Sequence, residues 1–266
     1  MIGPPLLDAR DVTVRYGGVT AVDRASVHVD TGEIVALIGP NGAGKTSLFN
    51  ALTGVVRPAS GTIRLCGLSV DGYAPHERAR LGMGRTFQHA ELFQRFTVRE
   101  NLVLAHYGAG RSGLLAGLLG SATARRDRDR AERRADELLA ATDLMEHADT
   151  PCAELPYGLQ RVATVARALV VPPKVLLLDE PSAGLGPSES EELAATITRI
   201  RDLLHIPVLL IEHNMELVMG VADYVYVLDF GIPLAEGRPD DVQNDPVVLR
   251  AYLGADDDAE DDALVG

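Results

Sequence analysis

Residues 39–46 have the types and spacing of a loop that binds phosphate, between the apolar run 34–38 and a helix expected over 47–52. Glycines let successive N–H groups turn toward one phosphate, and the helix adds its positive N-terminal end. We expect Lys45 to reach the β- and γ-phosphates of a nucleotide and Thr46 to offer its hydroxyl to Mg²⁺. A glycine-rich turn that matches by accident is the alternative, disfavoured by the order of strand, loop and helix. The candidate nucleotide-binding residues are Gly39, Pro40, Asn41, Gly42, Ala43, Gly44, Lys45, Thr46 and Ser47.

Two acidic residues and a histidine follow other apolar runs. The run 175–178 precedes Asp179 and Glu180, and His213 comes shortly after the run 207–211. A run that is apolar on both faces predicts a buried parallel strand, and α/β proteins bind ligands at the carboxyl ends of such strands. We expect Asp179 to hold Mg²⁺, Glu180 to polarise or deprotonate the attacking water, and His213 to contact the γ-phosphate and Glu180. The alternatives are a solvated strand end and a structural histidine.

Two residues in expected loops give weaker signals. Gln88, in the stretch 84–93, could ligate Mg²⁺ or position water through its amide oxygen and so sense the γ-phosphate. Tyr16, at the end of a strand expected from residue 6, could stack on a nucleotide base. An ordinary loop glutamine and a hairpin tyrosine are the alternatives.

An amphipathic helix is predicted to begin near Gly158. Apolar residues recur at helical spacing at Val162, Val165 and Leu169. Pro156 is compatible with this start, because proline is tolerated in the first turn of a helix. The free N–H groups at such an end suit an anion.

The composition predicts a soluble globular protein that does not bind nucleic acid. The chain has 266 residues, 46% of them hydrophobic, and its formal net charge of −13 repels phosphate backbones. Cys66 and Cys152 lack metal-ligand spacing, so reduced thiols are the simplest interpretation. The sequence has no signal peptide and no apolar run of the roughly 20 residues that span a bilayer. Residues 255–266 are acidic and are expected to form a disordered tail.

The segment 111–134 combines an apolar cluster at residues 114–119 with a mixed-charge run at 125–130. The favoured interpretation is a helical excursion with an exposed, salt-bridged face. The alternative is a surface that docks a membrane subunit or anionic lipid.

In this order, the motifs resemble those of the ATP-binding cassette subunits of ABC transporters, over about residues 6–254. The resemblance implies the roles of individual residues. The residues implied to act in catalysis are Glu180, His213 and the Q-loop residue Gln88. The residues implied to hold Mg²⁺ are Thr46, Gln88 and the Walker B residue Asp179. The residues implied to bind ATP are the A-loop residue Tyr16, the Walker A residues 39–47, and the signature residues Pro156, Tyr157 and Gly158.

The resemblance also implies the fold. It is an α/β fold with a RecA-like P-loop NTPase core at about residues 1–86 and 170–236 and an inserted helical subdomain at about 87–169. A C-terminal extension, residues 237–254, precedes the acidic tail. Two such cassettes would sandwich two Mg-ATP molecules, each bound by one chain's loop and capped by the other chain's signature.

Four shorter stretches are similar to the G-type ATPase of branched-chain amino acid importers: residues 85–89, 155–158, 212–215, and 245–246 with 251–254. This likeness implies two membrane permeases, a second ATPase chain in a hetero- or homodimer, a periplasmic substrate-binding protein, and a peripheral place on the cytoplasmic face of the inner membrane. Rival functions are a urea or amide importer, a lipid exporter, and a soluble ABC-type ATPase acting on ribosomes or DNA. The last is disfavoured, because the chain shows neither a second cassette nor a long coiled-coil insertion.

Three positions depart from the family pattern. Pro156 replaces the signature serine and offers no hydroxyl, and Leu159 replaces the usual glutamine. Gly186, just after the D-loop at residues 182–185, stands where many members carry aspartate. Because the signature acts on the partner's ATP, we expect the partner chain's site to be the weaker of the two.

Overall fold

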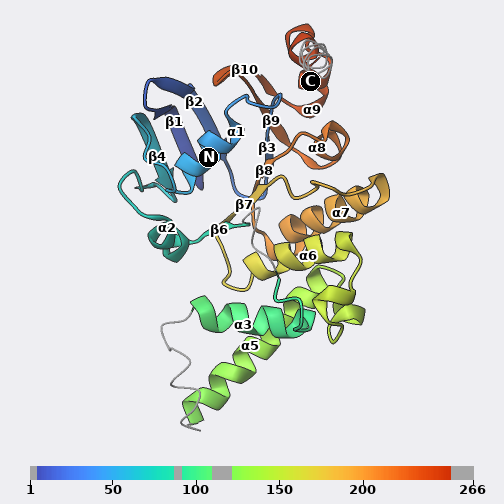
Figure 1. The fold of residues 1–266 in the computed structure, drawn as a ribbon. Helices are drawn as coiled ribbons and strands as arrows, with labels where there is room; N and C mark the ends of the chain where they lie inside the picture. The colour runs from blue at the N-terminus through green and yellow to red at the C-terminus, as the bar shows by residue number, and fades with distance from the viewer. Residues whose placement is uncertain (1–4, 87–91, 110–121, 253–266) are drawn as a thin grey trace.

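The computed structural model describes residues 5–86, 92–109 and 122–252, which form two β-sheets and a set of helices (Figure 1). The larger sheet has the order β10-β9-β3-β8-β7-β6; β10 is antiparallel to β9, and the other pairs are parallel. This sheet confirms the predicted α/β fold with parallel central strands. Its strands are β3 (Ile34–Ile38), β6 (Met83–Arg85), β7 (Val175–Asp179), β8 (Val208–Ile211), β9 (Tyr224–Asp229) and β10 (Ile232–Gly237).

The smaller sheet is antiparallel, in the order β2-β1-β4-β5, and contains a strand longer than predicted. The alternating apolar residues predict a strand only over 25–29, whereas β2 spans Val19–Val29. Asp11 and Arg24 have positive φ (50° and 51°), and the β1–β2 register shifts along the ladder. Such bulges interrupt the alternation of apolar residues, which hides the first half of the strand. The other strands are β1 (Leu7–Tyr16), β4 (Ser60–Leu65) and β5 (Leu68–Ser69).

The central strand β3 is buried on both faces, as its continuous apolar run predicts. Ile34, Ala36 and Ile38 enter a core shared with the helices, and Val35 and Leu37 enter a core shared with the smaller sheet. Because β7 and β8 are buried in the same way, the residues that follow these strands meet at one sheet edge.

The helices pack beside the larger sheet and below it in Figure 1. The sequence did not predict α3, whose residues Val98 and Leu102 are buried in the helical core. The helices are α1 (Lys45–Leu52), α2 (Pro75–Leu81), α3 (Val98–Ala109), α5 (Ala122–Ala141), α6 (Tyr157–Ala168), α7 (Pro187–Leu204), α8 (Met215–Val221) and α9 (Pro239–Gln243), followed by a helix over 246–252.

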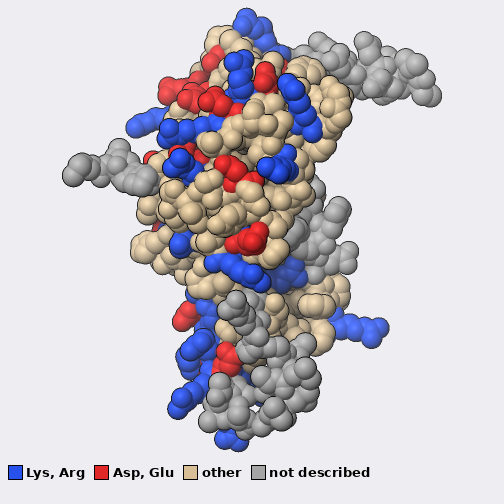
Figure 2. Space-filling view, turned by 90° about the vertical axis from the view of Figure 1, so that its left-hand side faces the viewer, with Lys and Arg blue, Asp and Glu red and all other residues tan. Residues whose placement is uncertain are grey.

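The described part of the mixed-charge segment is the exposed, salt-bridged helix that its composition predicts. On α5, Arg128 pairs with Glu132 at 2.8 Å and Arg134 pairs with Glu137 at 3.1 Å. Figure 2 shows basic side chains gathered at the lower end of the molecule, where α5 lies in Figure 1. Within the residues described, no helix is both long and apolar enough to cross a bilayer.

Candidate functional site

The predicted phosphate-binding loop runs from the end of β3 into the first turn of α1, which begins at Lys45, and its first and last glycines lie against other strands. Gly39 has φ 149°, and a Cβ there would lie 2.1 Å from the carbonyl oxygen of Leu228. Gly44 has φ 94°, and a Cβ there would lie 2.4 Å from the carbonyl oxygen of Ala21. Any side chain at either position would force the loop away from β2 or β9. The two glycines therefore set how the loop seats on the sheets.

Lys45 places a buried ammonium group inside this loop. Its Nζ donates hydrogen bonds to the carbonyl oxygens of Gly39 at 2.7 Å and Pro40 at 2.9 Å. Burial lowers the pKa of Lys45, and the carboxylates of Glu180 and Asp179 partly oppose this shift. The positive charge thus lies among the loop carbonyls, within range of the acidic residues at the ends of β7 and β8.

Asp179, the last residue of β7, is buried and incompletely satisfied. Its backbone N–H donates to the hydroxyl of Thr86 at 3.3 Å. Its Oδ1 is buried and has no hydrogen-bond partner in the described chain. Burial raises the pKa of Asp179, and the nearby guanidinium of Arg85 opposes the rise. A buried carboxylate oxygen without a donor suits a hard cation that binds oxygen.

Glu180, the next residue, has a strained backbone. Its φ is 44°, in the left-handed region that side chains avoid, and its N–H donates to the carbonyl of Ile211 on β8 at 2.9 Å. Strain of this kind costs about 1–3 kcal/mol and clusters at functional sites. This backbone conformation turns Glu180 away from the direction of β7, and the residue is half-buried.

His213 follows β8 at the same sheet edge as predicted, and its side chain is half exposed. In the part of the chain described, His213 makes no hydrogen bond to Glu180. Its Nδ1 instead lies 4.0 Å from an oxygen of Glu212.

Glu212 is a residue that sequence reasoning missed. Its side chain is fully buried, and its carboxylate accepts hydrogen bonds from the N–H groups of Ser182 (2.8 Å), His213 (3.1 Å) and Asn214 (3.3 Å). It thereby ties the turn that carries His213 to the D-loop. A glutamate directly after a buried apolar strand was the available signal, because such a charge needs several donors.

The signature stretch forms the start of α6. Pro156 is the N-cap and supplies no capping side chain. Tyr157 is exposed, whereas Gly158 is buried and its N–H donates to Oε1 of Glu189 at 3.1 Å. Leu159 packs against the helical core, which accounts for an apolar residue at that position.

Two further residues, Tyr16 and Gln88, were predicted to contact ATP or Mg²⁺. Tyr16 ends β1 and is 47% exposed. Gln88 lies outside the described residues, as does the acidic tail at residues 255–266.

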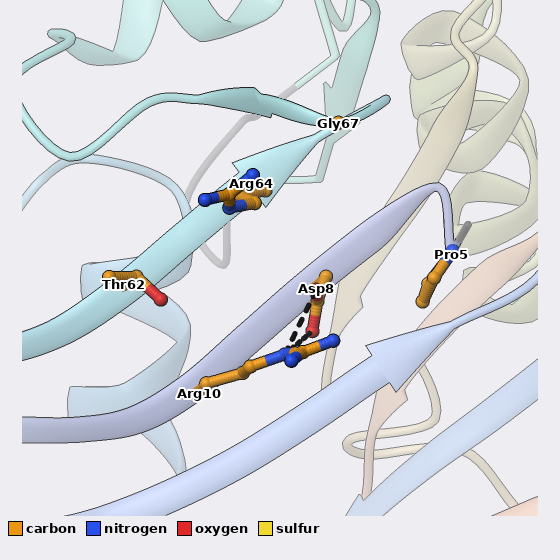
Figure 3. Close-up of a pocket in the computed structure, with 6 residues that line it drawn as sticks. All are labelled: Pro5, Asp8, Arg10, Thr62, Arg64 and Gly67. Atoms are coloured by element: carbon orange, nitrogen blue, oxygen red, sulfur yellow. Dashed lines mark hydrogen bonds and ion pairs between the residues drawn. The ribbon is translucent and has the colours of Figure 1, made fainter.

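A hollow of about 530 Å³ lies elsewhere, on the smaller sheet (Figure 3). Asp8 and Arg10 of β1 form an ion pair there at 2.9 Å. None of its lining residues belongs to the phosphate-binding loop or to the sheet edge that carries Asp179, so this hollow is not the site described above. The residues that line the hollow are Pro5, Asp8, Arg10, Thr62, Arg64 and Gly67.

Comparison with known proteins identifies the family. A family model described as ABC transporter matches residues 22–183, which include the phosphate-binding loop, the signature and Asp179. The chain belongs to the ABC transporter family. It is an ATP-binding subunit of that family, for which ATP hydrolysis is characteristic. A second model, described as branched-chain amino acid ATP-binding cassette transporter, matches residues 233–258 of this ABC protein.

Relatives of this ABC protein match over nearly its whole length. The high-affinity branched-chain amino acid transport ATP-binding proteins LivG of Salmonella typhimurium and BraF of Pseudomonas aeruginosa are 46% and 42% identical, covering 94% of this chain and 98% of each relative. The lipopolysaccharide export system ATP-binding protein LptB of Acidithiobacillus ferridurans is 34% identical, covering 94% of this chain and 97% of that protein. The ADP conformation of the ATP-binding cassette MJ1267 has a TM-score of 0.82 at 28% identity, covering 95% of this chain and all of that one.

Proposed function

We propose that this ABC subunit hydrolyses Mg-ATP to drive the import of branched-chain amino acids through membrane permeases. The observation that carries the substrate class is the 42–46% identity to LivG and BraF over nearly the whole chain. The match of the C-terminal residues 233–258 to a model specific for such transporters supports it independently.

In this proposal the loop residues 39–47 bind the phosphates and Tyr16 stacks on the base. Glu180 polarises or deprotonates the attacking water, and His213 contacts the γ-phosphate. Gln88 senses the γ-phosphate by ligating Mg²⁺ or positioning water. The strained backbone of Glu180 and the placement of Lys45 among the loop carbonyls support these roles. Backbone N–H groups and Lys45 then stabilise charge that develops on the γ-phosphate during in-line attack.

The residues that would hold Mg²⁺ are Thr46, Asp179 and Gln88. The unpartnered Oδ1 of Asp179 supports this set, and a Mg²⁺ ion bound with ATP takes most of its other ligands from phosphate and water. The described residues contain no cluster of three His, Cys, Asp or Glu side chains that could hold a metal by themselves. When bound, Mg²⁺ neutralises phosphate charge.

The proposed assembly pairs this chain with a second ATPase chain and two permeases at the cytoplasmic face of the inner membrane, where a periplasmic binding protein delivers the amino acid. The core at about residues 1–86 and 170–236 would bind one ATP. The signature residues Pro156, Tyr157 and Gly158, in the helical part at about 87–169, would cap the partner's ATP. The exposure of Tyr157 at the start of α6 supports such an intermolecular contact.

The test is to capture the tagged chain from membranes in mild detergent and to identify its companions by mass spectrometry. Two multi-spanning permeases and a second cassette are expected, and vesicles containing the complex should accumulate radiolabelled leucine in an ATP-dependent way. The E180Q complex, with the same subunits, is the matched control and should show no uptake. Recovery with ribosomes or DNA and without a permease would overturn the proposal.

Lipid export is a second candidate, because LptB is 34% identical over 94% of the chain. The same capture distinguishes the two functions. Companions that extract lipopolysaccharide, together with an absence of leucine uptake, would favour export.

A further inference from the structure

We propose that Glu189 is a positioning residue for the partner chain's ATP site, because its carboxylate fixes the signature turn of α6 to the start of α7. This inference rests on the proposed function, in which the signature caps the partner's ATP. It assigns a role to a residue outside the motifs that the sequence singled out.

The contact joins two segments that are distant in sequence and side by side in the structure (Figure 1). Oε1 of Glu189 accepts the N–H of Gly158 at 3.1 Å, and Oε2 accepts the N–H of Gly186 at 3.0 Å. A Cβ on Gly158 would come within 3.0–3.1 Å of the Glu189 side chain, so the two residues are in close packing. One carboxylate therefore satisfies unpaired amides at the starts of two helices.

Gly186 is itself a departure from the family pattern, and Gly158 lies two residues after the departure at Pro156. The N-cap of α6 is Pro156, which has no side-chain acceptor, and the N-cap of α7 is Gly186, which has none either. Glu189 supplies an acceptor for both helix starts. The side chain of Glu189 thus links the helix start at Pro156 to the helix start at Gly186.

A second link holds the same two segments. Arg161 donates to the carbonyl oxygen of Ala183 in the D-loop at 3.1 Å, and its guanidinium lies 4.9 Å from the centre of the Tyr157 ring. The Tyr157 hydroxyl also contacts Arg161 and lies 3.5 Å from the same carbonyl. The signature turn and the D-loop are therefore held together in this chain.

Glu189 acts on the partner's ATP site indirectly, because it holds the signature residues in position. Gly158, whose N–H donates to Glu189, is buried, whereas its neighbours Pro156 and Tyr157 are exposed. Pro156 has no N–H, and Gly158 already donates its N–H to Glu189. Of these three signature residues, Tyr157 therefore keeps a backbone N–H for a phosphate, and the effect of that donor depends on exact orientation. Glu189 fixes that orientation through its hydrogen bond to the next residue, Gly158.

The experiment uses the complete transporter and labels each cassette separately with a photoreactive ATP analogue trapped by vanadate. We expect E189A to lower trapping on the partner chain about tenfold, the usual effect of losing hydrogen bonds to a charged group. Trapping on this chain's own site should stay within twofold. E189Q keeps one acceptor oxygen and should fall between E189A and the unmodified complex. The matched control E191A removes an exposed carboxylate from the same helix and should change neither site.

If two copies of this chain form the pair, one copy carries the substitution and the other carries a tag that separates the labels. Equal losses at both sites would indicate general destabilisation and overturn the inference, as would an unchanged or increased label on the partner. A complex without a second cassette would instead overturn the proposed function, so the two failures are distinguishable.

Discussion

The carboxylate of Glu212 accepts the backbone N–H of Ser182 at 2.8 Å, in a place where the Glu212 side chain has no exposed surface. This bond connects the end of β8 to the first residue of the D-loop. Because the same carboxylate also accepts the N–H of His213, the histidine and the D-loop are positioned by one buried charge.

We predict that E212Q will lower the free energy of unfolding by about 2 kcal/mol, because the amide NH₂ would face N–H donors that now meet a carboxylate oxygen. Urea denaturation of the purified chain measures this difference. Glu192 is exposed on α7, so E192Q is the matched control and should change stability by less than about 0.5 kcal/mol. Equal effects of the two substitutions would show that the buried bonds are unimportant.

We predict that E180Q will lower ATP turnover at least about 100-fold, because the carboxylate proposed to activate water is lost. Binding of a fluorescent ATP analogue should remain, since Lys45 and the loop are unchanged. A parallel loss of binding would contradict a role limited to the chemical step. The exposed residue Glu191 provides the control, and E191Q should retain both activities.

The same substitution tests the asymmetry expected from Pro156. We predict that the partner's ATP site contributes less to turnover, because Pro156, in the signature proposed to cap that site, cannot offer the hydroxyl of a serine. Replacing the catalytic glutamate in this chain should therefore cost more turnover of the complex than replacing it in the partner. Equal losses would refute the asymmetry.

We predict that D179N will stabilise the nucleotide-free chain by about 1 kcal/mol while weakening its stabilisation by Mg-ATP. The reason is that Asp179 buries a carboxylate oxygen with no partner in the described chain, which costs folding energy, and that this oxygen is the proposed ligand of Mg²⁺. Thermal unfolding with and without Mg-ATP measures both effects. D129N, at an exposed position on α5, should leave both values unchanged. A destabilised nucleotide-free D179N would contradict the prediction.

We predict that Tyr252 makes stability fall in alkaline solution. Burial raises the pKa of Tyr252 to about 12, and the backbone of Gly39 partly opposes the rise. Above its ordinary pKa of about 10 the unfolded chain loses the proton first, so stability is full below pH 10 and declines as pH rises toward 12.

The quantity to compare is the free energy of unfolding of Y252F minus that of the unmodified chain. Between pH 8 and pH 11 this difference should rise by about 1 kcal/mol in favour of Y252F. Urea denaturation across this range is the measurement, and Y73F, at an exposed position, is the control. A pH-independent difference between Y252F and the unmodified chain would contradict the assignment.

The sequence alone determined the parallel strands and the residues at their ends. Continuous apolar runs specify strands buried on both faces, and β3, β7 and β8 are such strands. The spacing of glycines, lysine and threonine likewise specified a loop between β3 and α1, because few residue types permit that backbone.

Tertiary structure decided which groups meet. The burial of Glu212 and its bond to Ser182 join residues 30 positions apart, and the bond from Glu189 to Gly158 joins residues 31 apart. Local patterns cannot encode such contacts, because they arise only when α6, α7 and the sheet pack together. The bulged start of β2 and the helix α3 were also settled by packing, which overrides weak local preference.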